Sequence, residues 1–138
     1  EDKKSPITDI KTAVTQNTVP YTIAQNYFVK NTYAVGSLKN PKITTREDFE
    51  HIFGTATTMG TDGFSTSIDF SKQYVIAIIP SSSFKQTTLT VNSLVKDNRV
   101  IKLYYKQDEG NQQTFESQSC LVLIIDKIND GQVILYKN

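Results

Sequence analysis

The stretch "KQYVIAIIP", Lys72 to Pro80, decides the fold of this chain. Its apolar run is nearly continuous and ends at a proline, which cannot donate to a strand ladder. A short run of this kind is typical of a central strand that is buried on both faces. A second run, "CLVLIIDK" from Cys120 to Lys127, has the same character. We therefore expect two central strands of a β-sheet.

The sequence between these two runs predicts a β-hairpin. In "QTTLTVNSLVKDNRVIKLYYKQD", apolar and polar residues alternate, and Asp97-Asn98 supplies turn chemistry. The return strand is expected over Val100 to Lys106. After the second apolar run, "NDG" at 129–131 and the strand "QVILYK" predict a final hairpin. A calcium loop over Asp126 to Gln132 is disfavoured because the run lacks alternating acids and a terminal glutamate.

The stretch "TTREDFEHIFG" upstream predicts one short helix. Thr45 is a suitable N-cap, acidic residues follow in the first turn, and Gly54 stands where a C′ glycine would end the helix. Phe49 and Ile52 begin an apolar stripe that Phe53 completes. His51, the only histidine, points to solvent on this helix, so we interpret it as an exposed polar residue rather than a catalytic one.

These elements predict a mainly β (α+β) protein. Most of the strand connections are too short for crossover helices, so we expect a twisted, mostly antiparallel sheet or small sandwich with one short helix. Residues 1–6 are expected to form an N-terminal tether and residues 7–138 a single β-rich domain, in which 7–19 includes a further strand. The expected core residues are Phe49, Ile52, Phe53, Phe70, Val75, Ala77, Ile79, Leu89, Val91, Leu103, Leu121, Leu123 and Ile125.

Composition narrows the classes of function. The net charge is +1 and no block of like charge occurs, which disfavours a nucleic-acid surface. The apolar runs are far shorter than the ~20 residues of a membrane span. One cysteine and one histidine make a metal site improbable, and we expect no cofactor. We also expect a monomer.

The opening "EDKKSP" lacks a methionine, and the chain is rich in Thr, Asn, Lys, Gln and Tyr. We interpret this as an exported domain, periplasmic or at the cell surface, behind a removed signal or lipoprotein leader that would allow lipid anchoring. A trimmed cytoplasmic domain is the alternative.

The candidate binding residues lie after the first apolar run. In "PSSSFKQ", three small serines (Ser81, Ser82 and Ser83) precede Phe84 and Lys85. We expect a solvent-exposed loop whose phenylalanine anchors a protein partner, with folding of Phe84 over the sheet edge as the alternative.

Tyr104 and Tyr105 are adjacent, so on a strand they face opposite sides. One is expected in the core and the other in the interface, and we assign Tyr105 to the partner-binding set. Cys120 begins an apolar strand and is expected to be an inert thiol. A nucleophilic Cys120 activated by His51 stays open as the enzymatic alternative.

The pattern "IDFSKQYVIAIIP", then "TLTVNSLVKDNRVIKLYY", then "SCLVLIIDK" resembles the C-terminal domain of PrcB-like protease-complex subunits. The resemblance covers roughly Phe49 to Lys127 and includes Asp69-Phe70 before the long strand. The chain departs from that family in its "PSSSFKQTT" loop, which has no glycine, and in Ser119-Cys120, where the family often has a proline.

The resemblance implies a protease as partner. The sequence thus predicts an exported, non-catalytic protein-binding module, a protease-associated stabiliser or inhibitor. The alternatives are a structural domain of a cell-surface assembly and a Cys-dependent enzyme.

Overall fold

A computed structural model describes residues 17–34, 36, 38, 40–56 and 64–138 of the chain. The expected tether at 1–6 and most of the expected first strand lie outside the described residues. Strands account for 56% of the described residues, which confirms the mainly β prediction. None of the helices in this part of the chain is long and apolar enough to cross a membrane.

The elements follow one another as strands with a single short α-helix among the described residues. In chain order they are β1 (Asn17–Thr18), β2 (Thr22–Ile23), β3 (Tyr27–Val29), β4 (Lys42–Ile43), α2 (Arg46–Ile52), β5 (Phe53–Thr55), β6 (Gln73–Ile78), β7 (Ser83–Asp97), β8 (Val100–Ser117), β9 (Leu121–Asp126), the 3-10 turn η1 (Lys127–Asn129) and β10 (Gln132–Lys137).

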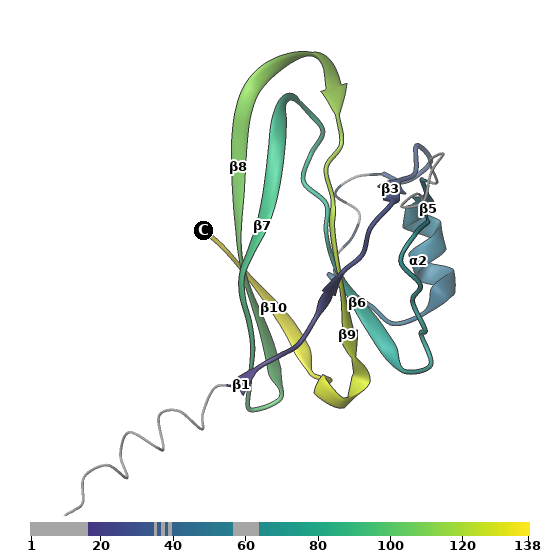
Figure 1. Cartoon of the computed structure of the whole chain (residues 1–138), viewed down its shortest axis with the longest axis vertical. Coiled ribbons are helices and arrows are strands. Elements are labelled where there is room, and N and C mark those ends of the chain that lie inside the picture. Colours follow the sequence, from purple (N-terminus) through teal and green to yellow (C-terminus); the bar gives the residue numbers. More distant parts are fainter. Residues whose placement is uncertain (1–16, 35, 37, 39, 57–63) are drawn as a thin grey trace, which may run out of the picture.

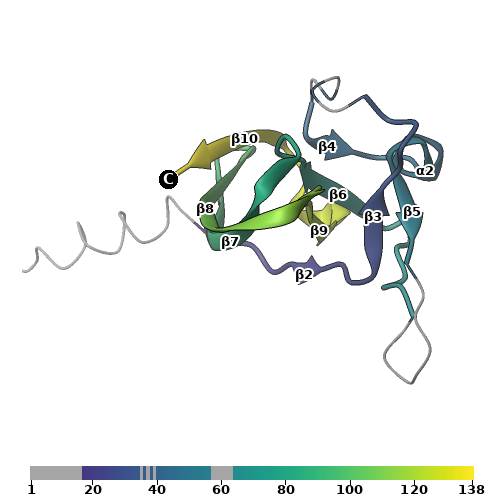
Figure 2. The same ribbon diagram turned by 90° about the horizontal axis from the view of Figure 1, so that it is seen from above.

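The strands form a sandwich with an added layer. The first sheet has the order β1-β7-β8-β10 and the second sheet β2-β9-β6-β4, while β3 and β5 form a two-stranded ribbon. Figures 1 and 2 show α2 and this ribbon on the side of the second sheet that faces away from the first. All the pairs except β8–β10 are antiparallel, so the predicted mostly antiparallel sandwich is confirmed.

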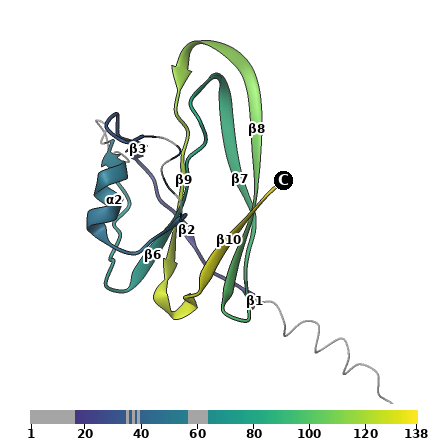
Figure 3. The same ribbon diagram turned by 180° about the vertical axis from the view of Figure 1, so that it is seen from behind.

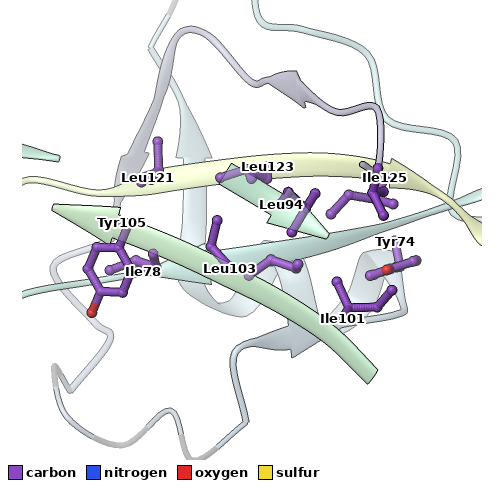
Figure 4. Packing of buried hydrophobic residues seen from close by; sticks show 11 residues of the cluster. Tyr74, Ile78, Leu94, Ile101, Leu103, Tyr105, Leu121, Leu123 and Ile125 are labelled. Atoms are coloured by element: carbon purple, nitrogen blue, oxygen red, sulfur yellow. The ribbon is translucent and has the colours of Figure 1, made fainter. Parts of the chain in front are cut away.

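The central strand β6 explains the unbroken apolar run of the sequence. It pairs with β9 through all six of its residues, and both strands are buried on both faces. Tyr74, Ile76 and Ile78 enter the first core, between the two sheets (Figure 4). Val75 and Ala77 alternate with them and enter the second core, beneath α2 and the ribbon. A strand in the middle of three layers has no polar face, as its sequence predicts.

The helix α2 begins as predicted but ends differently. Thr45 Oγ1 accepts a hydrogen bond from the Asp48 backbone N–H at 3.2 Å. At the other end the backbone turns directly into β5, so Phe53 is already extended. The expectation that Gly54 is a left-handed C′ residue is therefore wrong. Gly54 instead lies opposite Phe28 in the ribbon, where a Cβ would come within 2.7 Å of the Phe28 ring.

The predicted hairpin forms from β7 and β8, but its details differ. The turn residues are Asn98 and Arg99, with φ of 53° and 69°, one position beyond the expected Asp97-Asn98 pair. Two central residues at positive φ make a type I′ turn, whose twist suits a two-residue hairpin. The return strand runs far past Lys106, to Ser117. Figures 1 and 3 show the outer part of this hairpin projecting beyond the rest of the sandwich.

The prediction of a final hairpin with its turn at 129–131 is wrong. β10 does not pair with β9 but crosses to the first sheet and lies parallel to β8. The physical reason is that β9 has no free edge, because β2 and β6 already occupy both sides. The crossing brings Gly131 so close to Arg99 that any Cβ would clash with the Arg99 carbonyl.

The core prediction is largely confirmed. Most of its members are buried: Phe49, Ile52, Phe53, Val75, Ala77, Leu103, Leu121, Leu123 and Ile125. Four others, Phe70, Ile79, Leu89 and Val91, are partly buried and pack against one of the two cores.

Candidate protein-binding surface

Only the first two residues of the predicted loop Ser81–Lys85 form a loop in the structure. Ser81 and Ser82 connect β6 to β7, but Ser83 to Lys85 already belong to β7. Ser83 pairs with Ser117, and Lys85 with Gln112. The strand starts this early because β8 extends far enough to offer it an edge. We call the outer parts of the two strands, residues 83–90 and 106–117, the distal hairpin.

Two phenylalanine side chains of the distal hairpin are exposed to solvent. Phe84 in β7 is 49% exposed and Phe115 in β8 is 58% exposed. Phe84 is therefore not a core residue. Phe115 was missed in the sequence, although a lone aromatic residue in the polar run "GNQQTFESQ" is the signal that identifies it.

The pairing around these two residues is irregular. Register shifts fall between Ser83 and Lys85 and between Lys85 and Thr87. Such irregularities increase the local twist of a hairpin and change the direction of its side chains. They also leave fewer regular backbone positions for edge-to-edge pairing, so contact through side chains is favoured here.

Side-chain hydrogen bonds tie the base of the distal hairpin to its neighbours. Ser82 Oγ donates to Glu116 Oε2 at 3.0 Å, which joins the connection before β7 to the end of β8. Ser119 Oγ donates to the Thr87 carbonyl at 2.9 Å, just beyond the end of β8. Among the predicted residues, Ser82 thus makes a hydrogen bond to the residue that follows Phe115, while Lys85 is exposed.

The assignment of Tyr105 to the interface is wrong. Its side chain is only 8% exposed and belongs to the first core, and burial raises the pKa of its hydroxyl. Ile101 and Leu103 face inward on β8, so the two-residue period also turns Tyr105 inward. Tyr104 takes the outer face, where its ring stacks on Tyr136 with centroids 4.7 Å apart.

The alternative of a Cys-dependent enzyme requires His51 and Cys120, and the surroundings of these two residues differ from each other. His51 is exposed on α2. Cys120 is partly buried against the second core, and this burial raises the pKa of its thiol. A raised thiol pKa lowers the fraction of reactive thiolate at neutral pH. In the described ranges no group of three or more His, Cys, Asp or Glu side chains is arranged to hold a metal ion.

Comparison with known proteins found no match for this chain among family models, curated proteins or solved structures.

Proposed function

We propose that this chain is an exported, non-catalytic protein-binding module, and that its partner contacts the distal hairpin through Phe84 and Phe115. The observation that carries the proposal is the exposure of both rings on paired strands. Both rings belong to the strands of the distal hairpin, whose outer part extends beyond the rest of the sandwich (Figure 1). Aromatic anchors of this kind are common centres of protein interfaces.

The area left open on the two rings is large enough to matter. A phenylalanine buries about 150–250 Å² when fully covered, so a half-exposed ring has roughly 100 Å² left to bury. At about 25 cal/mol per Å², each ring contributes about 2.5 kcal/mol before the costs of association are subtracted. Lys85 and Glu116 stand beside the rings in sequence and provide charges of both signs for orienting a partner.

The resemblance to PrcB-like subunits makes a protease the first partner to consider, as an enzyme that the module stabilises or inhibits. Export, to the periplasm or the cell surface, is proposed on composition. The second candidate function is that of a structural domain in a surface assembly. In that case the chain associates with itself or with fixed neighbours, and its mass at micromolar concentration exceeds that of a monomer.

A capture experiment with matched variants tests the proposal. The wild-type chain, the double variant Phe84→Ala/Phe115→Ala and the control Ile128→Ala are immobilised and exposed to exported proteins of the source organism. Ile128 is 83% exposed and lies in η1, at the end of the sandwich opposite the distal hairpin (Figure 1). The Ile128→Ala substitution therefore removes exposed apolar area without changing the proposed surface.

We expect that the wild type and the control retain the same protein and that the double variant binds it at least about tenfold more weakly. This factor corresponds to the loss of an anchor that contributes ~2 kcal/mol to binding. The variants must keep the melting temperature of the wild type within a few degrees. Equal retention by all three chains, with all three folded, contradicts the proposed surface.

A further inference from the structure

One edge of the first sheet is longer than the other edges of the two large sheets. In the described part of the chain, three of these four edges are formed by β1, β2 and β4, which have two residues each. The fourth edge is β10, which has six residues. A two-residue edge offers little backbone to another chain, whereas a long regular edge is a template for a further strand.

The hydrogen bonds of β10 show which of its backbone groups are used. At one end the Gln132 N–H donates to the Arg99 carbonyl at 3.0 Å, and at the other end the Asn138 N–H donates to the Tyr105 carbonyl at 2.8 Å. The backbone groups of successive residues in a strand point to alternate sides, so every second residue of β10 faces β8. The residues whose N–H and carbonyl groups point away from β8 are Val133, Leu135 and Lys137.

The side chains of β10 indicate that this edge is open. Ile101 and Leu103 of β8 face the first core and are 0% exposed. Their register partners in β10, Val133 and Leu135, pack against the same core but are only partly buried. A further strand beside β10 would cover both of these side chains. Figure 2 shows β10 at the border of the first sheet, next to β8.

The sequence of β10 lacks the features that usually protect an edge strand. The strand "QVILYK" contains neither proline nor glycine, and its pairing with β8 has no register shift. Its only charged residue is Lys137, at its end. The strand is rich in β-branched and aromatic residues, which favour an extended backbone. The edge is thus regular, apolar and suited to pairing.

We propose that β10 pairs with β10 of a second copy of this chain, antiparallel and about a two-fold axis that passes beside Leu135. The first sheets of the two copies then join into one continuous sheet. In this register Val133 lies opposite Lys137 of the second copy, and Leu135 lies opposite Leu135. All the outward-facing backbone groups of β10 therefore find partners, whereas a shift of the register in either direction leaves some of them unpaired.

The side chains are complementary in the same register. On the outer face Ile134 lies opposite Tyr136 of the second copy, and an aromatic residue opposite a β-branched one is a favourable cross-strand pair. Tyr136 is 40% exposed, so it has area left to bury. Lys137 meets apolar Val133 rather than another cation, so like charges do not lie opposite each other. This self-complementarity is the reason to assign a second copy of the chain rather than a different protein.

The lengths of the strands set the size and the strength of the assembly. The edge β1, on the other side of the first sheet, is too short to receive β10 of a third copy, so the assembly closes as a dimer. A six-residue strand is about 20 Å long, and pairing along it buries less than the ~800 Å² per partner of a stable interface. We therefore expect a dissociation constant on the order of 0.1–1 mM.

This dimer is distinct from both candidate functions described above. At micromolar concentration the chain is a monomer, unlike a subunit of a structural surface assembly. The strand β10 contains neither Phe84 nor Phe115, so the absence of the dimer would leave the proposed partner-binding surface as it stands.

Sedimentation and hydrogen exchange test the dimer on the intact chain. Sedimentation equilibrium from about 10 μM to about 1 mM should show a monomer that converts to a dimer. The Ile134 and Tyr136 N–H groups, which face β8, should be protected from exchange at all concentrations. The N–H groups of Val133, Leu135 and Lys137 should exchange more slowly as the fraction of monomer falls. A monomer throughout, which would leave the edge to a strand of another protein, overturns the proposal. So do species larger than a dimer, or a dimer in which these three amides exchange as in the monomer.

A proline substitution tests the edge itself. Leu135→Pro removes an N–H that makes no bond to β8 and places the proline ring in the path of the second copy. It should weaken the dimer at least about tenfold while the chain stays folded, as its melting curve would show. Lys137→Pro acts in the same way at an exposed residue and serves if Leu135→Pro fails to fold. A folded proline variant that dimerises with the affinity of the wild type overturns the proposal.

Charge substitutions test the register. Val133→Lys places a cation opposite Lys137 of the second copy and should weaken the dimer at least about threefold. Adding Lys137→Glu to this variant replaces repulsion by attraction and should restore the affinity of the wild type. Such a recovery cannot come from a loss of stability in Val133→Lys. The control is Lys137→Glu alone, which faces apolar Val133 and should change the affinity less than about twofold. Equal affinities of Val133→Lys and the double variant overturn the proposal.

Discussion

Phe49→Ala is the substitution that most sharply tests the second core. The Phe49 side chain is 2% exposed and lies on α2 where it meets the second sheet. Its ring centroid is 5.1 Å from that of Tyr27, 4.9 Å from that of Phe53 and 5.7 Å from that of Phe70. The substitution therefore removes the centre of an aromatic cluster.

The expected loss follows from burial and from these ring contacts. Truncation of a buried phenylalanine to alanine costs ~3–5 kcal/mol. Three favourable ring contacts place Phe49 in the upper half of that range, so we expect ~4–5 kcal/mol. At about 3 °C per kcal/mol for a chain of this size, the melting temperature should fall by roughly 12–15 °C. Because a domain of this length is stabilised by about 7–20 kcal/mol, the variant should still fold.

Urea unfolding of wild type, Phe49→Ala and Phe84→Ala measures this loss against a matched control. Phe84 is the same residue type but 49% exposed, so its truncation should cost less than about 1 kcal/mol. The slopes of the unfolding transitions should agree within error, which licenses the comparison. A loss below about 1 kcal/mol for Phe49→Ala, or equal losses for the two variants, would refute the placement of α2 against the second sheet.

The remaining predictions concern the turn, an ion pair and the thiol. Arg99→Gly should stabilise the chain by roughly 0.5–1 kcal/mol in urea unfolding, because Arg99 holds a φ of 69° that glycine adopts without strain; a loss of stability would contradict the type I′ turn. The hydrogen bond from Lys42 lowers the pKa of Asp130 in the folded chain below its ordinary value near 3.8. The ionised Asp130 therefore stabilises the fold at pH values above its ordinary pKa, and this stabilisation is lost as the pH falls through the lowered pKa of the folded chain. Asp130 is largely exposed, so Asp130→Asn should cost only ~0–1 kcal/mol at pH 7, and the difference should vanish in strong acid. Cys120 should react with a thiol reagent much more slowly in the folded chain than in denaturant, since burial raises its pKa; equal rates in both states would revive the enzymatic alternative.

The sequence predicted the central strands because their chemistry is local. In the unbroken apolar runs at Lys72 to Pro80 and at Cys120 to Lys127, successive side chains point to opposite faces of a strand. Their apolar side chains leave water only if both faces of the strand are buried. The N-cap at Thr45 was equally readable, since a threonine before an acidic first turn specifies its own hydrogen bond.

The errors arose where pairing between distant strands decided the outcome. Nothing within "NDGQVILYK" indicates that both edges of β9 are occupied and that β10 must pair with β8 instead. In the same way, the length of β8 turns Ser83 to Lys85 from loop into strand, and no residue in "PSSSFKQ" encodes that length.

The candidate surface was half predictable. Phe84 was identified from its polar surroundings, but Phe115 has the same signal and was overlooked. Tyr105 was misassigned although the alternation from Ile101 through Leu103 already placed it inside.

Site-specific photo-crosslinking tests the central proposal most directly, because it reports contact at one side chain in the organism itself. A photoreactive phenylalanine analogue is placed at Phe84 in one chain and at Ile128, which is even more exposed, in another. We predict one defined protein adduct from position 84, present at native expression levels and missing from position 128. The same set of adducts from both positions, or none from position 84 when the chain is folded and exported, would contradict a partner-binding role for the distal hairpin.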